Sequence, residues 1–367
     1  MARTERLRVL QVVEAAAAGT FEVVTTVSER LAARGDSIAI AYGHRPETPA
    51  DMRARVAPSV EIFPLPWTAR TARAQLRAAR CLRRLVDEWR PDLVHLHSSF
   101  AGVVGALSLR GRAPLVYTPH AYSFMGAHGR GRRAAYRALE RLVARRTQLV
   151  AAVSESEARL AREVARAKRV ACVRNGIPEL DADGIPRPRS EAEPSVVAMG
   201  RIVPQRRPEE CARILSALGG TAAITWVGGG GPDGPDGPGI RALNEAGVEV
   251  TGWIDRDEAI ARLSAATAYL HWTAWDGQPL SVLEAMARDV VVVASDIEAN
   301  RELVGPGPVC RDEAEAVALL RSVVADPDHR ERLLASQRAR RGAYGARRMV
   351  DEWRELYEAV AGRGAAA

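Results

Sequence analysis

The chain has 367 residues, which is too long for one hydrophobic core of ordinary size and suits two domains. Hydrophobic residues make up 47% and charged residues 26% of it, as in a soluble globular protein, and no apolar segment approaches the roughly 20 residues of a membrane span. The four cysteines are scattered without a CxxC pair, so the sequence indicates neither a disulfide framework nor a zinc site and fits a reducing cytoplasm.

Charge is unevenly distributed along the chain, whose formal net charge is +7. Residues 1–180 carry 30 basic and 16 acidic side chains, and the remaining residues carry 22 and 29. A basic first half suits anionic lipid, an acidic acceptor or nucleic acid. The alternative is that these arginines only solvate helix surfaces, and the sequence leaves both interpretations open.

The first half alternates apolar strands with helices. Arg3, Arg6 and Arg8 precede the first apolar run, as in a signal peptide, but Glu14 interrupts that run, and its alternation indicates a strand instead. The expected strands are residues 7–13, 37–42, 93–97, 115–118, 149–153 and 170–173. One helix is expected to follow the first strand and to end near residue 34, and two more are expected at 70–89 and 131–146. This alternation predicts a parallel sheet that opens with a βαβ unit of the dinucleotide-binding kind.

The same pattern restarts after residues 181–194, a polar and proline-rich stretch that predicts an interdomain linker. The second set comprises strands at 195–199, 223–227, 248–250, 268–271 and 290–294, a helix at 209–218 and a low-complexity loop at 229–239. A last helix, 346–362, is expected to cross back to the first domain. We therefore expect a first domain at 1–178, a linker at 179–195 and a second domain at 196–345.

The stretch WDGQPLSVLEAMA, residues 275–287, places an acidic residue, a turn glycine and a proline before a helix expected to begin near Ser281. Backbone N–H groups at residues 280–282 would face a diphosphate or sugar hydroxyls, where the helix dipole favours negative charge. Glu284 would then bind ribose hydroxyls through charge-assisted hydrogen bonds. Ser281 and Glu284 also fit a capping box, which stabilises a helix start without any ligand. The stretch alone leaves both interpretations open.

Together with other motifs along the chain, this stretch resembles glycosyltransferase family four, which usually has EGFxxxxLEAMA here. The other motifs are VYTPHAYSF (116–124), AVSESE (152–157), VRNGIPE (173–179), GRIVPQRRP (200–208) and SDIEANRELV (295–304). The resemblance covers nearly the whole chain. It implies the GT-B architecture, an α/β fold of two Rossmann-like domains whose parallel sheets face a central cleft, with a nucleoside diphosphate sugar as donor.

In the second domain, the resemblance implies that Gly277, Pro279, Leu280, Ser281 and Glu284 bind the donor. It also implies that the preceding acidic residue, Asp276, contacts hydroxyls of the transferred sugar and takes part in catalysis. The family usually has glutamate at this position, and aspartate is one methylene shorter. Either the sugar sits differently or the contact runs through water, so the identity of the donor sugar stays open.

Arg201 and Arg206 follow the first strand of the second domain, and ligands bind at such strand ends in open α/β sheets. Two cations there would bind the donor and stabilise the leaving diphosphate, whose charge grows as the glycosidic bond breaks. The family has arginine and then lysine at this spacing, and a planar guanidinium makes different contacts from an ammonium. The alternative for Arg206 is a solvated cluster with Arg207.

Histidines mark the strand ends of the first domain. His120 follows a strand, and the resemblance implies that it reaches the donor sugar and shapes the site for the transition state; the alternative is a structural histidine. His95 and His97 point to one face of their strand. A metal pair is conceivable, but no carboxylate cluster accompanies them, so we expect His97 to line the cleft and His95 to lie in the core.

Gly19, Asn300 and Glu302 complete the candidate residues. Gly19 ends the first loop and would let the backbone approach the donor phosphates, although the family's loop is richer in glycine than residues 15–18 here. Asn300 and Glu302 match a family position near the acceptor or the donor sugar. A surface helix start is the alternative for these two.

These residues predict a retaining transfer that uses no metal and no other cofactor. An oxocarbenium-like sugar would form, and the acceptor hydroxyl would approach on the leaving-group side, where a phosphate oxygen takes its proton. No enzyme nucleophile is evident. The pairs at 181/183 and 255/257 mimic the metal-binding DxD of the other transferase fold, but we interpret both as surface features.

The expected donor is a UDP-sugar, and the expected acceptor belongs to cell-surface polysaccharide or glycolipid assembly. The basic helices at 70–84 and 130–146 would suit docking of a cytoplasmic protein to the anionic inner face of the membrane. Tailoring of a small soluble natural product is the rival acceptor class, and a nucleotide-sugar epimerase is the rival enzyme class. Nucleic acid is not an expected partner, because no basic stripe carries interleaved stacking aromatics.

Overall fold

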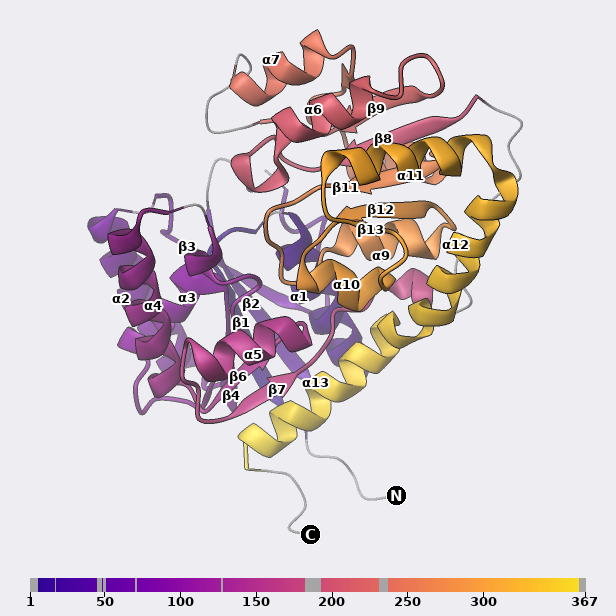
Figure 1. The fold of residues 1–367 in the computed structure, drawn as a ribbon. Coiled ribbons are helices and arrows are strands. Elements are labelled where there is room, and N and C mark those ends of the chain that lie inside the picture. The colour runs from indigo at the N-terminus through magenta and orange to yellow at the C-terminus, as the bar shows by residue number, and fades with distance from the viewer. Residues whose placement is uncertain are drawn as a thin grey trace. The chain divides into compact units, whose positions relative to one another are not determined.

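The computed structural model describes residues 6–16, 18–44, 48, 51–69, 71–126, 128–181, 193–230 and 237–362. Most of the expected linker, part of the loop at 229–239, and position 183 of the first DxD pair lie outside these residues. The chain divides into two compact units: Met1–Gly176 with Ala346–Ala367, and Ile177–Gly345. Each is an α/β unit with an all-parallel sheet (Figure 1), which confirms the predicted fold class of two Rossmann-like domains.

The first unit has a seven-stranded sheet in the order β3-β2-β1-β4-β5-β6-β7. Its strands are β1 (Arg8–Val13), β2 (Ser37–Gly43), β3 (Glu61–Leu65), β4 (Leu93–His97), β5 (Leu115–Thr118), β6 (Leu149–Ala152) and β7 (Val170–Cys172). Its helices are α1 (Ala18–Ala33), α2 (Ala72–Trp89), α3 (Ser98–Ser108), α4 (Arg130–Arg146), α5 (Glu155–Glu163) and α13 (Ala346–Val360).

The two faces of this sheet have separate cores because strand side chains alternate in direction. Leu10 and Val12 of β1 pack with the buried faces of α2, α3, α4 and α5. Helix α2 contributes a face of buried residues four positions apart, Ala78, Leu82 and Val86, as an amphipathic helix should. On the opposite face, α1 packs against α13, and the Gln11 side chain of β1 contacts α13.

The second unit has a six-stranded sheet in the order β10-β9-β8-β11-β12-β13. Its strands are β8 (Ser195–Met199), β9 (Ala223–Val227), β10 (Glu249–Val250), β11 (Ala268–His271), β12 (Val291–Ser295) and β13 (Val309–Cys310). Its helices are α6 (Pro208–Ser216), α7 (Pro238–Glu245), α8 (Arg256–Ala265), α9 (Leu280–Ala287), α10 (Glu298–Val304), α11 (Glu313–Ala325) and α12 (Pro327–Arg341). Alternate residues of β12 again enter two cores, one beneath α6, α7 and α11 and the other beneath α8, α9 and α10.

Strand order reverses beside the first strand of each sheet, between β1 and β4 in the first unit and between β8 and β11 in the second. In an open α/β sheet, such a reversal leaves a crevice at the carboxyl ends of the two strands, where ligands bind. The residues that follow Met199 and His271 therefore lie where the fold favours a site. The same holds for the residues that follow Val13 and His97 in the first unit.

The structure differs from the sequence expectations at Gly19 and in several elements that were not expected. Gly19 is the second residue of α1, in its first turn, and so does not end a loop. The strands β3 and β13 and the helices α3, α5, α7, α11 and α12 were not among the expected elements, although Asp312 and Asp326 are typical N-cap residues and begin α11 and α12. Within the described part of the chain, no helix is both long enough and apolar enough to cross a membrane.

Candidate active site

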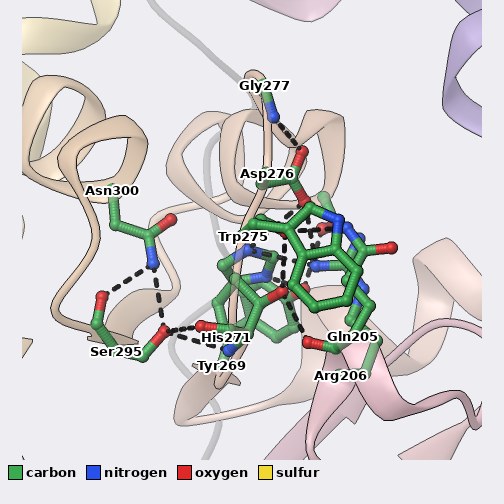
Figure 2. Close-up of polar contacts among 11 residues, drawn as sticks. Gln205, Arg206, Tyr269, His271, Trp275, Asp276, Gly277, Ser295 and Asn300 are labelled. Atoms are coloured by element: carbon green, nitrogen blue, oxygen red, sulfur yellow. Dashed lines mark hydrogen bonds and ion pairs between the residues drawn. The ribbon is translucent and has the colours of Figure 1, made fainter. Parts of the chain in front are cut away.

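In the second unit, the loop after β8 joins the loop after β11 directly. The backbone oxygen of Gln205 accepts hydrogen bonds from the Ala274 N–H at 2.8 Å and the Thr273 hydroxyl at 3.0 Å. The Gln205 amide in turn donates to the Trp275 carbonyl at 2.7 Å. The two segments that the sequence associated with a diphosphate therefore lie at the same edge of the sheet (Figure 2).

Arg206 lies at the centre of this junction. Its Nη1 is 3.1 Å from the Asp276 carboxylate Oδ2 and 3.3 Å from the His271 Nε2. The Asp276 Oδ1 accepts the Gly277 N–H at 2.8 Å, which fixes the carboxylate at the start of the turn before α9 (Figure 2). Both charged side chains are largely buried, with 21% of the arginine and 14% of the aspartate exposed. The structure thus brings together two of the predicted catalytic residues.

His271 forms a hydrogen bond with Arg206, and the sequence did not predict it as a site residue. Burial, with the Arg206 charge as a second cause, holds the pKa of His271 well below its usual range, so the ring is neutral. Its Nε2 accepts from Arg206, so its Nδ1 carries the proton and donates to the Tyr269 hydroxyl at 3.0 Å. Tyr269 then donates to the Ser281 hydroxyl at 2.8 Å. The signal available in the sequence was a histidine at the carboxyl end of a predicted strand.

This chain of hydrogen bonds excludes the capping-box interpretation of Ser281. Helix α9 has Pro279 as its N-cap and no side-chain cap, so Ser281 lies inside the first turn, and its hydroxyl bonds to Tyr269. The first-turn N–H groups, at Leu280 and Ser281, have no acceptor within the helix. These free N–H groups are suited to bind an anion. The ion pair of Arg206 and Asp276 lies just before this helix start.

Glu284, four residues further along α9, is a buried carboxylate with 5% of its side chain exposed. Its Oε1 accepts from the Arg256 Nη2 at 2.6 Å. Arg256 opens α8, whose N-cap is Asp255; this aspartate accepts the Glu258 N–H at 2.8 Å. Asp255 of the second DxD pair is exposed and caps a helix, in agreement with its interpretation as a surface feature. Arg256 itself was missed, because only the tertiary fold brings it to Glu284.

The loops after β8 and β9 approach each other too closely for side chains. Gly200 and Gly228 have φ angles of 129° and 124°, a region that favours glycine. A Cβ on Gly228 would lie 2.4 Å from the Gly200 carbonyl oxygen, which accepts the Trp226 indole N–H at 2.9 Å. Arg201 follows this fixed glycine and is exposed.

Asn300 and Glu302 lie on α10 beside β12. The Asn300 side chain is fully buried, and its Nδ2 donates to the Ser295 carbonyl at 2.8 Å. Ser295 in turn bonds to Thr273 through two hydrogen bonds, so Asn300 supports the loop after β11 (Figure 2). This burial excludes, for Asn300, the alternative of a surface helix start. Glu302 is half-buried, and its carbonyl accepts from the Tyr344 hydroxyl.

In the first unit, His120 lies at the carboxyl edge beyond β5. His120 and Ala121 have φ angles of 51° and 73°, which are strained for residues with a side chain. The buried Glu157 holds this turn, because its carboxylate accepts the Ala121 N–H at 2.7 Å and the Val153 N–H at 2.9 Å. The His120 Nε2 is 2.9 Å from the Nδ1 of His97, so the two histidines lie at the same edge of the sheet, where His97 is buried.

His95 is fully buried between Tyr357 of α13 and Thr118, so it lies in the core as predicted. Gly19 is half-buried in the first turn of α1. Among the described residues, no group of three or more histidine, cysteine, aspartate or glutamate side chains is arranged to hold a metal ion.

Comparison with solved structures identifies the fold. The chain matches sucrose-phosphate synthase from Thermosynechococcus elongatus with a TM-score of 0.81 at 19% identity, over 96% of this chain and 99% of that one. It matches Anabaena HepE, solved in complex with UDP and glucose, with a TM-score of 0.77 at 17% identity over 96% and 99%. The lipopolysaccharide outer core galactosyltransferase WaaB gives 0.67 at 14% identity, also over 96% and 99%. The fold is therefore that of the GT-B glycosyltransferases.

Family models then give the affiliation of the sequence. The model of Glycosyltransferase Family 4 matches residues 17–179, and that of Glycosyl transferases group 1 matches residues 193–326. The chain belongs to the family 4 type of glycosyltransferases. A Klebsiella pneumoniae relative, described as an uncharacterized 41.2 kDa protein in the cps region, is 23% identical over 232 residues. That match spans 59% of this chain and 63% of the relative, less than two thirds of its length.

Proposed function

We propose that this glycosyltransferase moves a sugar from a nucleoside diphosphate sugar, preferably a UDP-sugar, to an acceptor hydroxyl with retention of configuration and without a metal. The observation that carries the proposal is the position of Arg206 at the carboxyl edge of the second sheet. It lies between Asp276 and the neutral His271, next to the open amides of α9. This arrangement offers a cation and N–H donors to a diphosphate at one place.

The proposed roles follow from the chemistry of each group. Arg201, Arg206 and the amides at Leu280 and Ser281 would hold the diphosphate and stabilise the charge that it gains as the bond to the sugar breaks. Glu284, a buried carboxylate on α9, would accept hydrogen bonds from ribose hydroxyls.

Three further roles rest on the family resemblance. Asp276 would bind hydroxyls of the transferred sugar, and its Oδ2 has no hydrogen-bond partner apart from the ion pair with Arg206. From the first unit, His120 would contact the donor sugar, and the start of α1 at Gly19 would approach the donor phosphates. The acceptor hydroxyl would attack from the side of the departing diphosphate, whose oxygen would take the proton.

A thermal-shift screen across nucleotide sugars tests this proposal. A ligand that binds only the folded protein stabilises it by about 2.7 kcal/mol at a hundred times its Kd. We expect one UDP-sugar and UDP itself to raise the Tm, with and without EDTA. No stabilisation by any nucleotide sugar would contradict the proposed donor class, and a shift that EDTA abolishes would contradict transfer without a metal.

We further propose that the acceptor lies at an anionic membrane surface, in cell-surface polysaccharide or glycolipid assembly. Helix α3 packs between α2 and α4 on one face of the first unit. Each of the three helices exposes a leucine: Leu76 is 59% exposed, Leu107 50% and Leu139 40%. Helices α2 and α4 also carry exposed arginines: Arg73, Arg77, Arg80, Arg83, Arg84, Arg130, Arg132, Arg133 and Arg137. Exposed apolar side chains within a basic surface fit the headgroup region of an anionic bilayer.

Co-sedimentation with vesicles tests the membrane proposal. The wild-type protein is expected to pellet with phosphatidylglycerol vesicles at low salt and to be released at high salt, because surface charge is screened. Replacing Arg132, Arg133 and Arg137 by glutamine should abolish pelleting. The control replaces Arg301, Arg311 and Arg332, exposed arginines of the second unit, by glutamine and so makes the same change in net charge. If the wild type stays in the supernatant, or both triple variants lose binding equally, the proposed surface is wrong.

A further inference from the structure

A buried network of hydrogen bonds crosses the first unit from α13 to His120 through the side chain of Gln11. Gln11 lies in β1 and is fully buried. Its Oε1 is 2.8 Å from the His97 Nε2, and its Nε2 is 3.1 Å from the Tyr357 hydroxyl. The His97 Nδ1 is 2.9 Å from the His120 Nε2. The amide of Gln11 is thus the branching point between a path to His120 and a path to α13.

An amide fixes the direction of the bonds around it, because its oxygen only accepts and its nitrogen only donates. The His97 Nε2 must therefore carry a proton and donate it to the Gln11 Oε1. A neutral His97 then has a lone pair on Nδ1, so the His120 Nε2 must carry the proton of that bond. By this chain, one glutamine determines which nitrogen of His120 is protonated.

The second path obeys the same rule. The Gln11 Nε2 donates to the Tyr357 oxygen, and His95 Nδ1, at 2.7 Å, is the only other described group bonded to this hydroxyl. The hydroxyl hydrogen therefore goes to the His95 Nδ1. The His95 Nε2 then donates to the Thr118 hydroxyl at 2.8 Å. All three histidines therefore have the same proton position, on Nε2.

The surroundings keep these rings uncharged. Burial holds the pKa of His95 and His97 well below the usual range and lowers that of His120 to about 4. The charged forms also repel one another, because the three rings are neighbours: the His95 and His97 centroids lie 3.9 Å apart and those of His97 and His120 5.2 Å.

The other groups that face the network do not alter this charge state. Tyr357, Thr118 and Trp353 face His95, and burial raises the pKa of Tyr357 far above neutrality. No carboxylate or guanidinium of the described residues is hydrogen-bonded to any of the three rings. The Nδ1 of His120 has no hydrogen-bond partner among those residues, so it keeps an unshared lone pair at the edge of the sheet.

We propose that Gln11 and His97 are positioning residues, which fix His120 as the Nε2–H tautomer with the Nδ1 lone pair directed away from the network. The catalytic meaning of this arrangement rests on the proposed function, in which His120 approaches the donor sugar. A ring locked in one tautomer offers a hydrogen-bond acceptor of constant orientation at the edge of the sheet. The role of Gln11 is then to hold that acceptor, without itself contacting substrate.

The tautomers can be measured without any activity assay. Long-range proton–nitrogen NMR correlation of ¹⁵N-histidine-labelled wild-type protein, at pH 6 to 8, separates the Nε2–H, Nδ1–H and doubly protonated rings. We expect His95, His97 and His120 all to be neutral Nε2–H forms, with no change over this range. Nδ1–H forms of His97 and His120, or a doubly protonated ring, would overturn the proposal, because the first shows the opposite amide orientation.

The second measurement is the pH dependence of transfer in the variant Gln11→Glu. A carboxylate next to the His97 Nε2 raises the pKa of His97, because an opposite charge favours the imidazolium form. Protonated His97 cannot accept from His120, so the bond between them is lost as the pH falls. We expect the rate of Gln11→Glu to decline about tenfold for each pH unit below the raised pKa of His97. The wild-type rate should show no such decline between pH 6 and 8.

Gln75→Glu is the matched control in the same unit. The Gln75 Oε1 accepts the Trp67 indole N–H at 2.9 Å, a bond that a carboxylate keeps. This variant should have the wild-type pH profile. If Gln11→Glu also has that profile, the positioning role is refuted; if the wild type neither binds nor transfers a nucleotide sugar, the proposed function fails, while the NMR result still decides the tautomer. A Gln11→Glu protein that does not fold leaves the wild-type NMR measurement as the deciding test.

Discussion

The variant Arg206→Ala is expected to lower the kcat for sugar transfer by about 10²–10³-fold, the loss typical of removing one group that stabilises developing negative charge. The fall should appear in kcat and in kcat/KM together, because the cation matters most when the diphosphate departs. The loss also leaves the Asp276 Oδ2 without its ion-pair partner, since that atom accepts no hydrogen bond. Steady-state kinetics with donor and acceptor at saturation measure the effect.

Two further variants separate the position of this charge from its mere presence. Arg206→Lys keeps a cation, and because lysine occupies this position in the family's usual motif, we expect its kcat to fall by no more than about tenfold. Arg207→Ala removes the neighbouring guanidinium, which pairs with Glu210 at 3.1 Å, and should be close to wild type. Equal losses in Arg206→Ala and Arg207→Ala would show that only the overall charge of the loop matters.

The variant Glu284→Gln is expected to weaken binding of UDP by about 10- to 150-fold, or about 1.5–3 kcal/mol, the range for a hydrogen bond to a charged group. An amide has the shape of the carboxylate but accepts fewer and weaker bonds from two ribose hydroxyls. Arg256, which now bonds the Glu284 Oε1, is 42% exposed and stays hydrated in the variant. The folded structure should therefore survive, and isothermal titration with UDP measures the change in Kd.

Glu258→Gln serves as the matched control for this second variant. Glu258 lies in α8 two residues after Arg256, and its exposed carboxylate bonds to Arg262 at 3.3 Å. Its replacement removes one negative charge from the same region without touching the buried carboxylate. We expect an unchanged Kd for UDP. Wild-type affinity in Glu284→Gln would mean that the ribose lies elsewhere.

Much of the fold follows from local patterns in the sequence. Short apolar runs such as residues 268–271 gave strands at the predicted positions, because strands buried on both faces are continuously apolar. The sequence assigned Arg206 and Asp276 to one donor site partly through the family resemblance. Their meeting agrees with a general rule, since both lie in loops that follow β8 and β11, which are neighbours in the sheet.

The remaining features depend on contacts that no local pattern contains. Ser281 and Glu284 have the spacing of a capping box, but Pro279 occupies the N-cap position, and the Ser281 hydroxyl accepts a hydrogen bond from Tyr269. Arg256 reaches Glu284 from a different helix, and Asn300 is buried against Ser295. In each of these cases the partner lies on a separate element, so its identity depends on tertiary packing.

A crystal structure of the protein with UDP is the most direct test of the proposed site. We expect the diphosphate within hydrogen-bond distance of the Arg206 guanidinium and of the Leu280 and Ser281 amides, with the ribose hydroxyls on the Glu284 carboxylate. If UDP at saturating concentration leaves this place empty, or binds with its phosphates away from Arg206 and α9, the proposed function is wrong.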